Sequence, residues 1–214
     1  MTNENELNKN FNVPSWWNQA NKQLSKCDKL LGKVIKSNGS ETLLLRKQPF
    51  NSLARSIVGQ QISVKAAASI WKNLEKSIQT ISIESIKDAD HNLLMSCGLS
   101  KRKSEYLHNL AIGLENRKEV SDWCKYSNIE VIQKLTSIKG IGKWTAEMFL
   151  IFCLGRQDIF PTGDLGLLNA LGKLHGTERP SPSEAEELGN VWRPWRTAAT
   201  WHLWRSIDPI PINY

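Results

Sequence analysis

The chain has 214 residues, including 28 Lys or Arg and 21 Asp or Glu, which gives a formal net charge of +7. This excess of positive charge favours a polyanionic partner such as nucleic acid. No apolar run reaches the roughly 18 residues that a membrane span needs, and the polar N-terminus has no apolar signal core, so we expect neither membrane insertion nor secretion.

The four cysteines, Cys27, Cys97, Cys124 and Cys153, are widely spaced and form no C-x-x-C pair. The four histidines form no i, i+4 pair, so we expect no metal site and predict reduced, buried thiols, as in a cytosolic interior. Nine tryptophans are many for this length. They fit core packing, and in a basic chain they also fit base stacking.

The first half of the chain reads as a series of helices after a polar tail. Residues 1–12 are predicted to be a frayed tail. From Pro14 apolar residues recur at helical spacing until Gly39 breaks the pattern, and a short apolar patch at 43–45 precedes Pro49. The following helices are expected to begin at the N-cap residues Ser63, Asp90 and Ser100.

The second half continues this pattern. Asn128 is predicted to cap the helix that leads to Leu135, and Ser183 to Glu186 form an expected capping box. Pro194 is expected in the first turn of a last helix that runs to Arg205. No alternating strand pattern is longer than a few residues, so the chain is predicted to be all-α, with about nine or ten helices.

We expect one two-lobed helical domain over residues 13–214. A central lobe is predicted at about 50–125, and a second lobe from 13–49 together with 126–208. A cleft between two lobes is a favoured place for an active site.

Two glycines, Gly140 and Gly142, flank Ile141 between two predicted helices. Glycines allow a tight turn that leaves amide groups facing outward at the start of the second helix, where an anion such as a DNA phosphate can bind. A Walker loop is excluded, because it needs four residues between its glycines and Ser or Thr where Trp144 follows Lys143. A simple interhelical turn is the alternative.

The order of the motifs adds a family resemblance. L-x-x-I-x-G-I-G-x-W-T-A-x-M at 135–148, followed by F-P-T-G-D at 160–164, resembles the helix-hairpin-helix plus Gly/Pro-Asp signature of the DNA glycosylase superfamily. Three further stretches, at 53–63, 98–107 and 192–205, resemble its alkyladenine (3-methyladenine DNA glycosylase II) branch. The resemblance runs from about residue 16 to residue 208, and it implies an all-α fold with a helix-hairpin-helix motif.

Asp164 has two interpretations. From its sequence context alone, an aspartate before an apolar helix is an N-cap. The resemblance implies that it is the catalytic aspartate. Cleavage of an N-glycosidic bond builds positive charge on the deoxyribose, which a carboxylate can stabilise, and the same group could activate the attacking water.

The resemblance also implies how the substrate is held. Bifunctional members carry at the position of Trp144 a lysine that forms a Schiff base, so a tryptophan predicts a monofunctional enzyme. Trp144 and Trp204 are expected to line an aromatic pocket for a flipped, cationic base. Met148 also falls in this pocket, where the best-known bacterial members have an aromatic residue, and the departure leaves the lesion range open.

The expected DNA contacts lie in two segments. Gln61, with Ile62 beside it, is the candidate for the wedge that fills the gap left by the flipped base, although the segment also reads as a turn capped by Ser63. At the hairpin the expected DNA-binding residues are Lys139, Gly140, Ile141, Gly142, Lys143 and Thr145.

The predicted function is a monofunctional DNA glycosylase that removes alkylated purines and starts base excision repair. The expected partner is double-stranded DNA containing alkylated bases, the expected state is a monomer, and the expected location is cytoplasmic and nucleoid-associated in a bacterium or nuclear in a eukaryote. No cofactor is expected, apart from a monovalent cation that the resemblance allows at the hairpin. Some members of the family that the chain resembles have a Cys-ligated iron–sulfur cluster after the last helix, and that cluster is not expected here because no cysteine follows Cys153. The alternatives are a non-catalytic helix-hairpin-helix DNA-binding protein and a glycosylase for another lesion.

Overall fold

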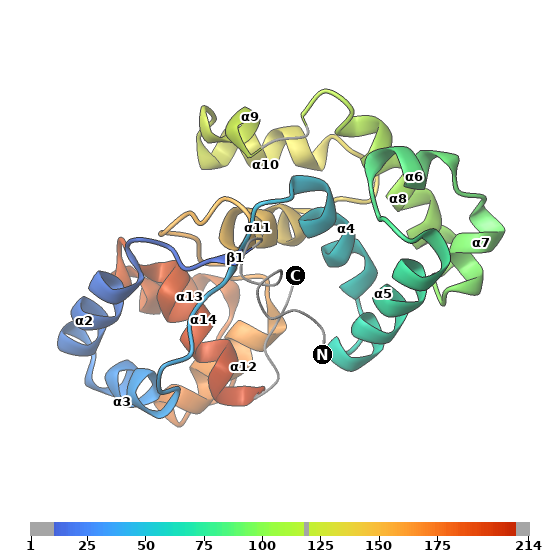
Figure 1. Cartoon of the computed structure of the whole chain (residues 1–214). Coiled ribbons are helices and arrows are strands. Elements are labelled where there is room, and N and C mark those ends of the chain that lie inside the picture. Colours follow the sequence, from blue (N-terminus) through green and yellow to red (C-terminus); the bar gives the residue numbers. More distant parts are fainter. Residues whose placement is uncertain (1–10, 118–119, 209–214) are drawn as a thin grey trace. The chain divides into compact units, whose positions relative to one another are not determined.

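The computed structural model describes residues 11–117 and 120–208 and is almost entirely helical (Figure 1). The prediction of an all-α fold is confirmed. No helix in these two ranges is long and apolar enough to cross a membrane. In chain order the elements are β1 (Phe11–Asn12), α2 (Trp17–Cys27), α3 (Lys29–Ser37), β2 (Leu45–Arg46), α4 (Pro49–Gly59), α5 (Val64–Ile78), α6 (Ile83–Asp88), α7 (His91–Ser96), α8 (Lys101–Gly113), α9 (Ser121–Cys124), α10 (Asn128–Thr136), α11 (Lys143–Phe152), α12 (Leu165–His175), α13 (Pro182–Gly189), the 3-10 helix η1 (Asn190–Trp192) and α14 (Arg196–Ile207).

Three predicted N-caps are confirmed. The side chain of Ser63 accepts a hydrogen bond from the backbone of α5, that of Asp90 from α7, and that of Ser100 from α8. Each satisfies an amide that has no partner inside its own helix. The helices α6 and α9, with 6 and 4 residues, are too short to show a helical period and were not predicted.

The predicted cap at Asn128 is wrong by one residue. Ser127 is the N-cap of α10, and its hydroxyl accepts from the backbone N–H of Glu130. The Glu130 carboxylate in turn accepts from the Ser127 N–H at 2.8 Å, which completes a capping box. Ser127 has the Glu three residues later that the motif requires, and Asn128 does not.

The predicted capping box at Ser183–Glu186 is also displaced. The box is formed by Ser181 and Glu184, with Pro182 as the first residue of α13. Proline suits this position because its missing N–H has no helical partner there. The sequence Ser-Pro-Ser offers two serines as candidates, and the position of Pro182 favours the first.

The last helix begins later than predicted. Pro194 lies before α14 rather than in its first turn, and Trp195 is the residue that precedes the helix. The Trp195 N–H donates to the carbonyl oxygen of Trp192 at 2.7 Å, so a turn separates η1 from α14.

The packing of the helices divides the described residues into two compact units. One contains residues 46–154, and the other contains 11–45 together with 155–208. This differs from the expected division, which assigned residues 126–154 to the second lobe. The physical reason is that α11 packs against α4 and α10 packs against α11, so both helices join the 46–154 unit.

Helix α4 is the centre of the 46–154 unit. It packs against α5, α8 and α11, while α6 and α7 pack against α8 (Figure 1). Its core positions Leu53, Ala54, Ile57 and Val58 are at most 1% exposed. Burial on several sides explains why apolar and small residues follow one another in this helix.

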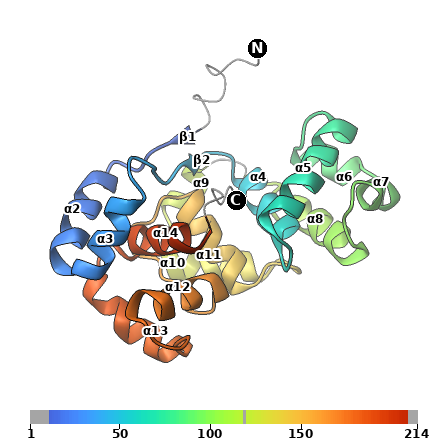
Figure 2. The same cartoon turned by 90° about the horizontal axis from the view of Figure 1, so that it is seen from below.

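Helix α14 is the centre of the other unit. It packs against α2, α3 and α12, so segments from opposite ends of the chain lie side by side (Figure 2). Trp17 of α2 meets Trp201 edge-on, with the ring centroids 5.2 Å apart, and stacks on His202 at 5.3 Å. Much of the tryptophan content is therefore core packing.

Candidate functional site

The glycine hairpin joins α10 to α11. Gly142 is the N-cap of α11 and has no side chain with which to cap the first amides of that helix. A Cβ added at Gly142 would meet no described atom within 4 Å, so the space beside it is open. An uncapped helix N-terminus next to open space is suited to binding an anion.

Gly140 is required by both its conformation and its packing. Its φ is +102°, which disfavours any residue with a Cβ. A Cβ at this position would lie 2.2 Å from Cγ of Tyr106 on α8, so the ring packs directly on the hairpin backbone. Ile141 is 5% exposed and anchors the turn in the apolar core.

The two lysines of the hairpin remain at the surface. Lys139 is exposed, and the side chain of Lys143 is 70% exposed. Lys143 Nζ lies 3.6 Å from Glu147 Oε1, one turn further along α11. Only the lysine end of this pair is exposed, because the Glu147 side chain is 9% exposed. Both ammonium groups, of Lys139 and Lys143, are therefore accessible to an anionic partner.

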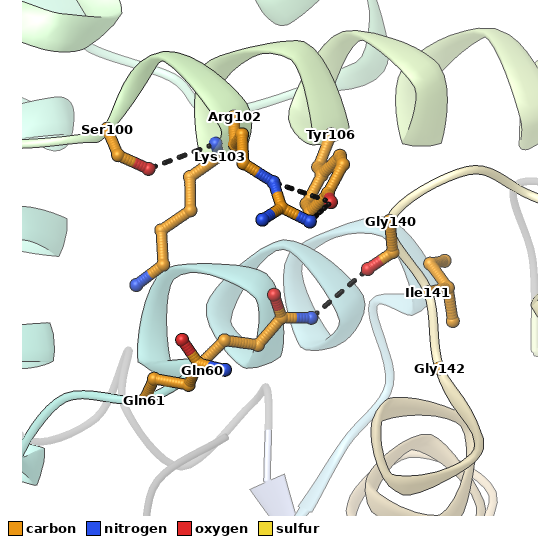
Figure 3. A pocket seen from close by; sticks show the side chains of 9 residues that line it. All are labelled: Gln60, Gln61, Ser100, Arg102, Lys103, Tyr106, Gly140, Ile141 and Gly142. Atoms are coloured by element: carbon orange, nitrogen blue, oxygen red, sulfur yellow. Dashed lines mark hydrogen bonds between the residues drawn. The ribbon is translucent and has the colours of Figure 1, made fainter.

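A surface pocket of about 400 Å³ adjoins the hairpin (Figure 3). The hairpin, the segment after α4 and the first turns of α8 line it, and of the described lining residues Arg102 and Lys103 are cationic and none is acidic. The guanidinium of Arg102 donates to Tyr106 Oη at 2.8 Å. The sequence analysis assigned no role to Tyr106, although this residue lies in the 98–107 stretch that carries part of the family resemblance.

The predicted contact residues on α11 lie at different depths. Thr145 is 1% exposed, and its hydroxyl accepts a hydrogen bond from Gln60 Nε2 at 3.1 Å. Met148 is fully buried, and Trp144 is half-buried. The side chain of Thr145 therefore contacts the protein interior, while the predicted pocket roles of Trp144 and Met148 stay predictions.

The predicted wedge residues are accessible. Gln61 is exposed, and the apolar side chain of Ile62 is 38% exposed. Gln61 has a φ of +57°, a left-handed conformation that few residues with a Cβ adopt.

Asp164 is the N-cap of α12. Its Oδ1 accepts a hydrogen bond from the Leu167 N–H at 2.7 Å and another from Trp204 Nε1 at 2.8 Å. The half-buried carboxylate is thus held by a backbone donor and a side-chain donor. A helix N-terminus also favours negative charge, so capping and a role in stabilising positive charge are compatible.

Trp204 supports Asp164 from α14. Its side chain is 4% exposed, and its indole N–H is directed at the carboxylate. The two residues are 40 positions apart, and the packing of α12 on α14 brings them together. This support role was not predicted; the predicted stacking of Trp204 on a base stays a prediction.

The candidate residues thus fall into two groups. Gln61, Ile62 and the hairpin belong to the 46–154 unit, as do Trp144 and Met148, whereas Asp164 and Trp204 belong to the other. The active-site cleft expected between lobes stays a prediction.

A metal site is not indicated in the described ranges, where no group of three or more His, Cys, Asp or Glu could hold an ion. At the hairpin, the carbonyl oxygen of Ile138 accepts from the Ile141 N–H and that of Gly140 accepts from Gln60. Each carbonyl keeps a second lone pair. These oxygens suit a monovalent cation chemically, and the cation stays a prediction.

Comparison with known proteins decides the family. Residues 54–194 match the family described as HhH-GPD superfamily base excision DNA repair protein. The chain belongs to this superfamily. The DNA-3-methyladenine glycosylase 1 of Schizosaccharomyces pombe is 36% identical over 186 residues, covering 83% of this chain and 81% of the relative. The prediction of a DNA glycosylase in the HhH-GPD superfamily is confirmed.

Two solved structures agree in fold with this chain. The S. pombe 3-methyladenine DNA glycosylase Mag1, in complex with abasic DNA, matches with a TM-score of 0.81 at 33% identity, over 88% of this chain and 96% of that one. A DNA-3-methyladenine glycosidase from Bacillus halodurans matches with a TM-score of 0.71 at 34% identity, over 86% of each chain.

Proposed function

We propose that this HhH-GPD protein is a monofunctional glycosylase that flips alkylated purines out of double-stranded DNA and hydrolyses their N-glycosidic bond. The observation that carries the proposal is the carboxylate of Asp164, which is oriented by the Leu167 N–H and by Trp204. Relatives named as 3-methyladenine glycosylases support the substrate class.

The carboxylate acts on the charge that develops in the reaction. As the glycosidic bond breaks, positive charge grows on the deoxyribose, and a preorganised carboxylate stabilises it more effectively than mobile water does. An alkylated purine that already carries positive charge leaves as a neutral base. The protein therefore needs no strong general acid at the leaving group.

Trp144 supports hydrolysis without strand cleavage. A Schiff base needs an amine at the reacting carbon, and an indole has none. Lys143 is the neighbouring amine. It is exposed and lies beside Glu147 on the next turn, which supports a role toward DNA phosphate rather than toward the sugar.

Two assays on one substrate test the proposal. Duplex DNA treated with a methylating agent should release 3-methyladenine or 7-methylguanine on incubation with the protein, and the strand should remain intact until alkali is added. Borohydride should trap no covalent protein–DNA adduct. DNA binding without base release would instead indicate a non-catalytic binding protein, and release of a different base would assign another lesion class.

We also propose that the enzyme acts as a monomer and resides with the DNA, in the nucleoid of a bacterium or the nucleus of a eukaryote. The proposed location follows from the DNA substrate.

A further inference from the structure

The segment after α4 has a defined conformation although two of its side chains are exposed. Gln61 has a φ of +57°, and Ile62 follows it with 38% of its surface exposed. A residue with a Cβ keeps a left-handed conformation only where neighbouring contacts hold it there. The contacts on either side of Gln61 therefore explain how the segment is fixed.

The first of these contacts is the side chain of Gln60. Its Nε2 donates to the carbonyl oxygen of Gly140 at 3.1 Å (Figure 3). The same Nε2 also donates to Thr145 Oγ1 at 3.1 Å. Both acceptors lie in well-packed surroundings, because Gly140 of the hairpin is covered by the ring of Tyr106 and Thr145 of α11 is 1% exposed. Gln60 thus joins the segment after α4 to the hairpin across 80 residues of sequence.

The second contact comes from α8. Lys103 Nζ donates to the carbonyl oxygen of Val58 at 2.7 Å, close to the C-terminus of α4. A cation is favourable at a helix C-terminus, where the last carbonyls lack partners. Partial burial of the ammonium group lowers the pKa of Lys103. Lys103 anchors the end of α4, and Gln60 fixes the segment that follows α4 against the hairpin and α11.

We infer that Gln60 is a positioning residue that sets the wedge at Gln61 and Ile62 at a fixed place relative to the hairpin. The inference rests on the proposed function, in which the hairpin holds the DNA backbone and the wedge fills the gap left by the flipped base. With the link intact, a protein that has bound the backbone presents its wedge already ordered. Without the link, the segment must be ordered when DNA binds, so gap filling weakens while backbone binding does not.

The test measures gap recognition apart from base excision. Affinity is measured for two duplexes that differ only in one abasic-site analogue, which offers the gap and has no base to release. In Gln60→Ala the preference for the abasic duplex should fall about tenfold, as expected for the loss of two neutral hydrogen bonds. Affinity for the undamaged duplex should stay within about twofold. Gln133→Ala, which removes an exposed glutamine on α10, should change neither value.

A second variant separates a positioning role from a general loss of folding. Thr145→Val keeps the side-chain shape and removes one acceptor of Gln60, so the preference should fall about threefold. The double variant should be no worse than Gln60→Ala, because the two residues share one hydrogen bond. Hydrogen exchange of amides 60–63 in free Gln60→Ala should be faster than in the wild type.

The inference would be overturned if Gln60→Ala kept the wild-type preference for the abasic duplex. It would also be overturned if the variant lost affinity equally for both duplexes, or if the wild-type protein had no preference for the abasic duplex. Failure of the proposed function is a separate result. It would appear as no release of methylated bases by a wild-type protein that still prefers the abasic duplex.

Discussion

The hairpin at Gly140 and the carboxylate of Asp164 are each held by an aromatic side chain from another helix, and the aromatic group acts differently in the two places. Tyr106 covers Gly140 by contact and occupies the space where a Cβ would be. Trp204 supplies a hydrogen-bond donor to Asp164. In the proposed function the hairpin presents its backbone to DNA, so binding and stability should be most sensitive to substitution of its glycines. At Asp164 a side chain is presented instead, so activity should be most sensitive to changes in the Asp164 carboxylate and in the indole N–H of Trp204.

The largest effect on stability is expected from Gly140→Ala. The new Cβ would lie 2.2 Å from the Tyr106 ring in a backbone with φ +102°. Strain and overpacking together should cost about 3 kcal/mol of the free energy of unfolding, measured by chemical denaturation. Gly142→Ala is the matched control: φ there is −91° and the space is open, so its loss should stay below about 1 kcal/mol. Equal losses would contradict the packing argument.

Trp204→Phe should separate chemistry from binding. It removes the donor to Asp164, and a hydrogen bond to a charged group contributes about 1.5 to 3 kcal/mol, so base release should slow by about 10- to 100-fold. Affinity for undamaged DNA should hardly change. Trp201→Phe, on the same helix, removes the same volume without touching that hydrogen bond. Similar rates for the two variants would show that Trp204 acts by packing alone.

Acid should weaken the unit that contains Asp164. Burial of His202 lowers its pKa to about 3, and its ring contacts the side chains of Asn21 and Asn38. The unfolded histidine binds a proton near pH 6.5, so stability is complete above that pH and falls as the pH drops toward 3. The loss from His202 should reach roughly 2 kcal/mol at pH 5. Between pH 7 and pH 5, the free energy of unfolding of the wild type should fall by roughly 2 kcal/mol more than that of His202→Gln. Equal losses in the two proteins would contradict this prediction.

The smallest effects are expected from the exposed lysines of the hairpin. Lys139→Ala or Lys143→Ala should weaken binding to any duplex by a few fold and lower the salt dependence of binding by about one released ion each. Base release at saturating DNA should be unchanged. Titrations at several salt concentrations would test this, with Lys22→Ala on α2 as the control. A change in sequence or lesion preference would contradict a pure phosphate contact.

Local features such as N-caps were predictable from the sequence where only one residue in the segment suited the position. The caps at Ser63 and Ser100 were predicted correctly because no neighbour competes with them. Ser127 was missed because Asn128 beside it is also a good cap, and the Glu three residues later decides between them. The hairpin was recognisable because its two glycines are close together in the sequence.

The supporting contacts were not predictable in the same way. Gln60 meets Gly140 across 80 residues, and Trp204 meets Asp164 across 40, so neither pair has a characteristic spacing. Hydrogen bonds of this kind depend on how helices pack, and packing is decided by the whole apolar pattern. The family resemblance indicated Asp164 and Trp204 separately, and the structure adds the bond between them.

The central claim is that Asp164 performs the chemistry while the backbone of the hairpin holds DNA, and Asp164→Asn tests it most directly. Asparagine is also a good N-cap and still accepts hydrogen bonds, so the variant should remove the charge and leave α12 intact. The measurement is single-turnover release of methylated bases together with affinity for an abasic duplex. Release should fall by about 10²- to 10³-fold or more while affinity stays within about threefold. Release close to the wild-type rate would contradict the assignment.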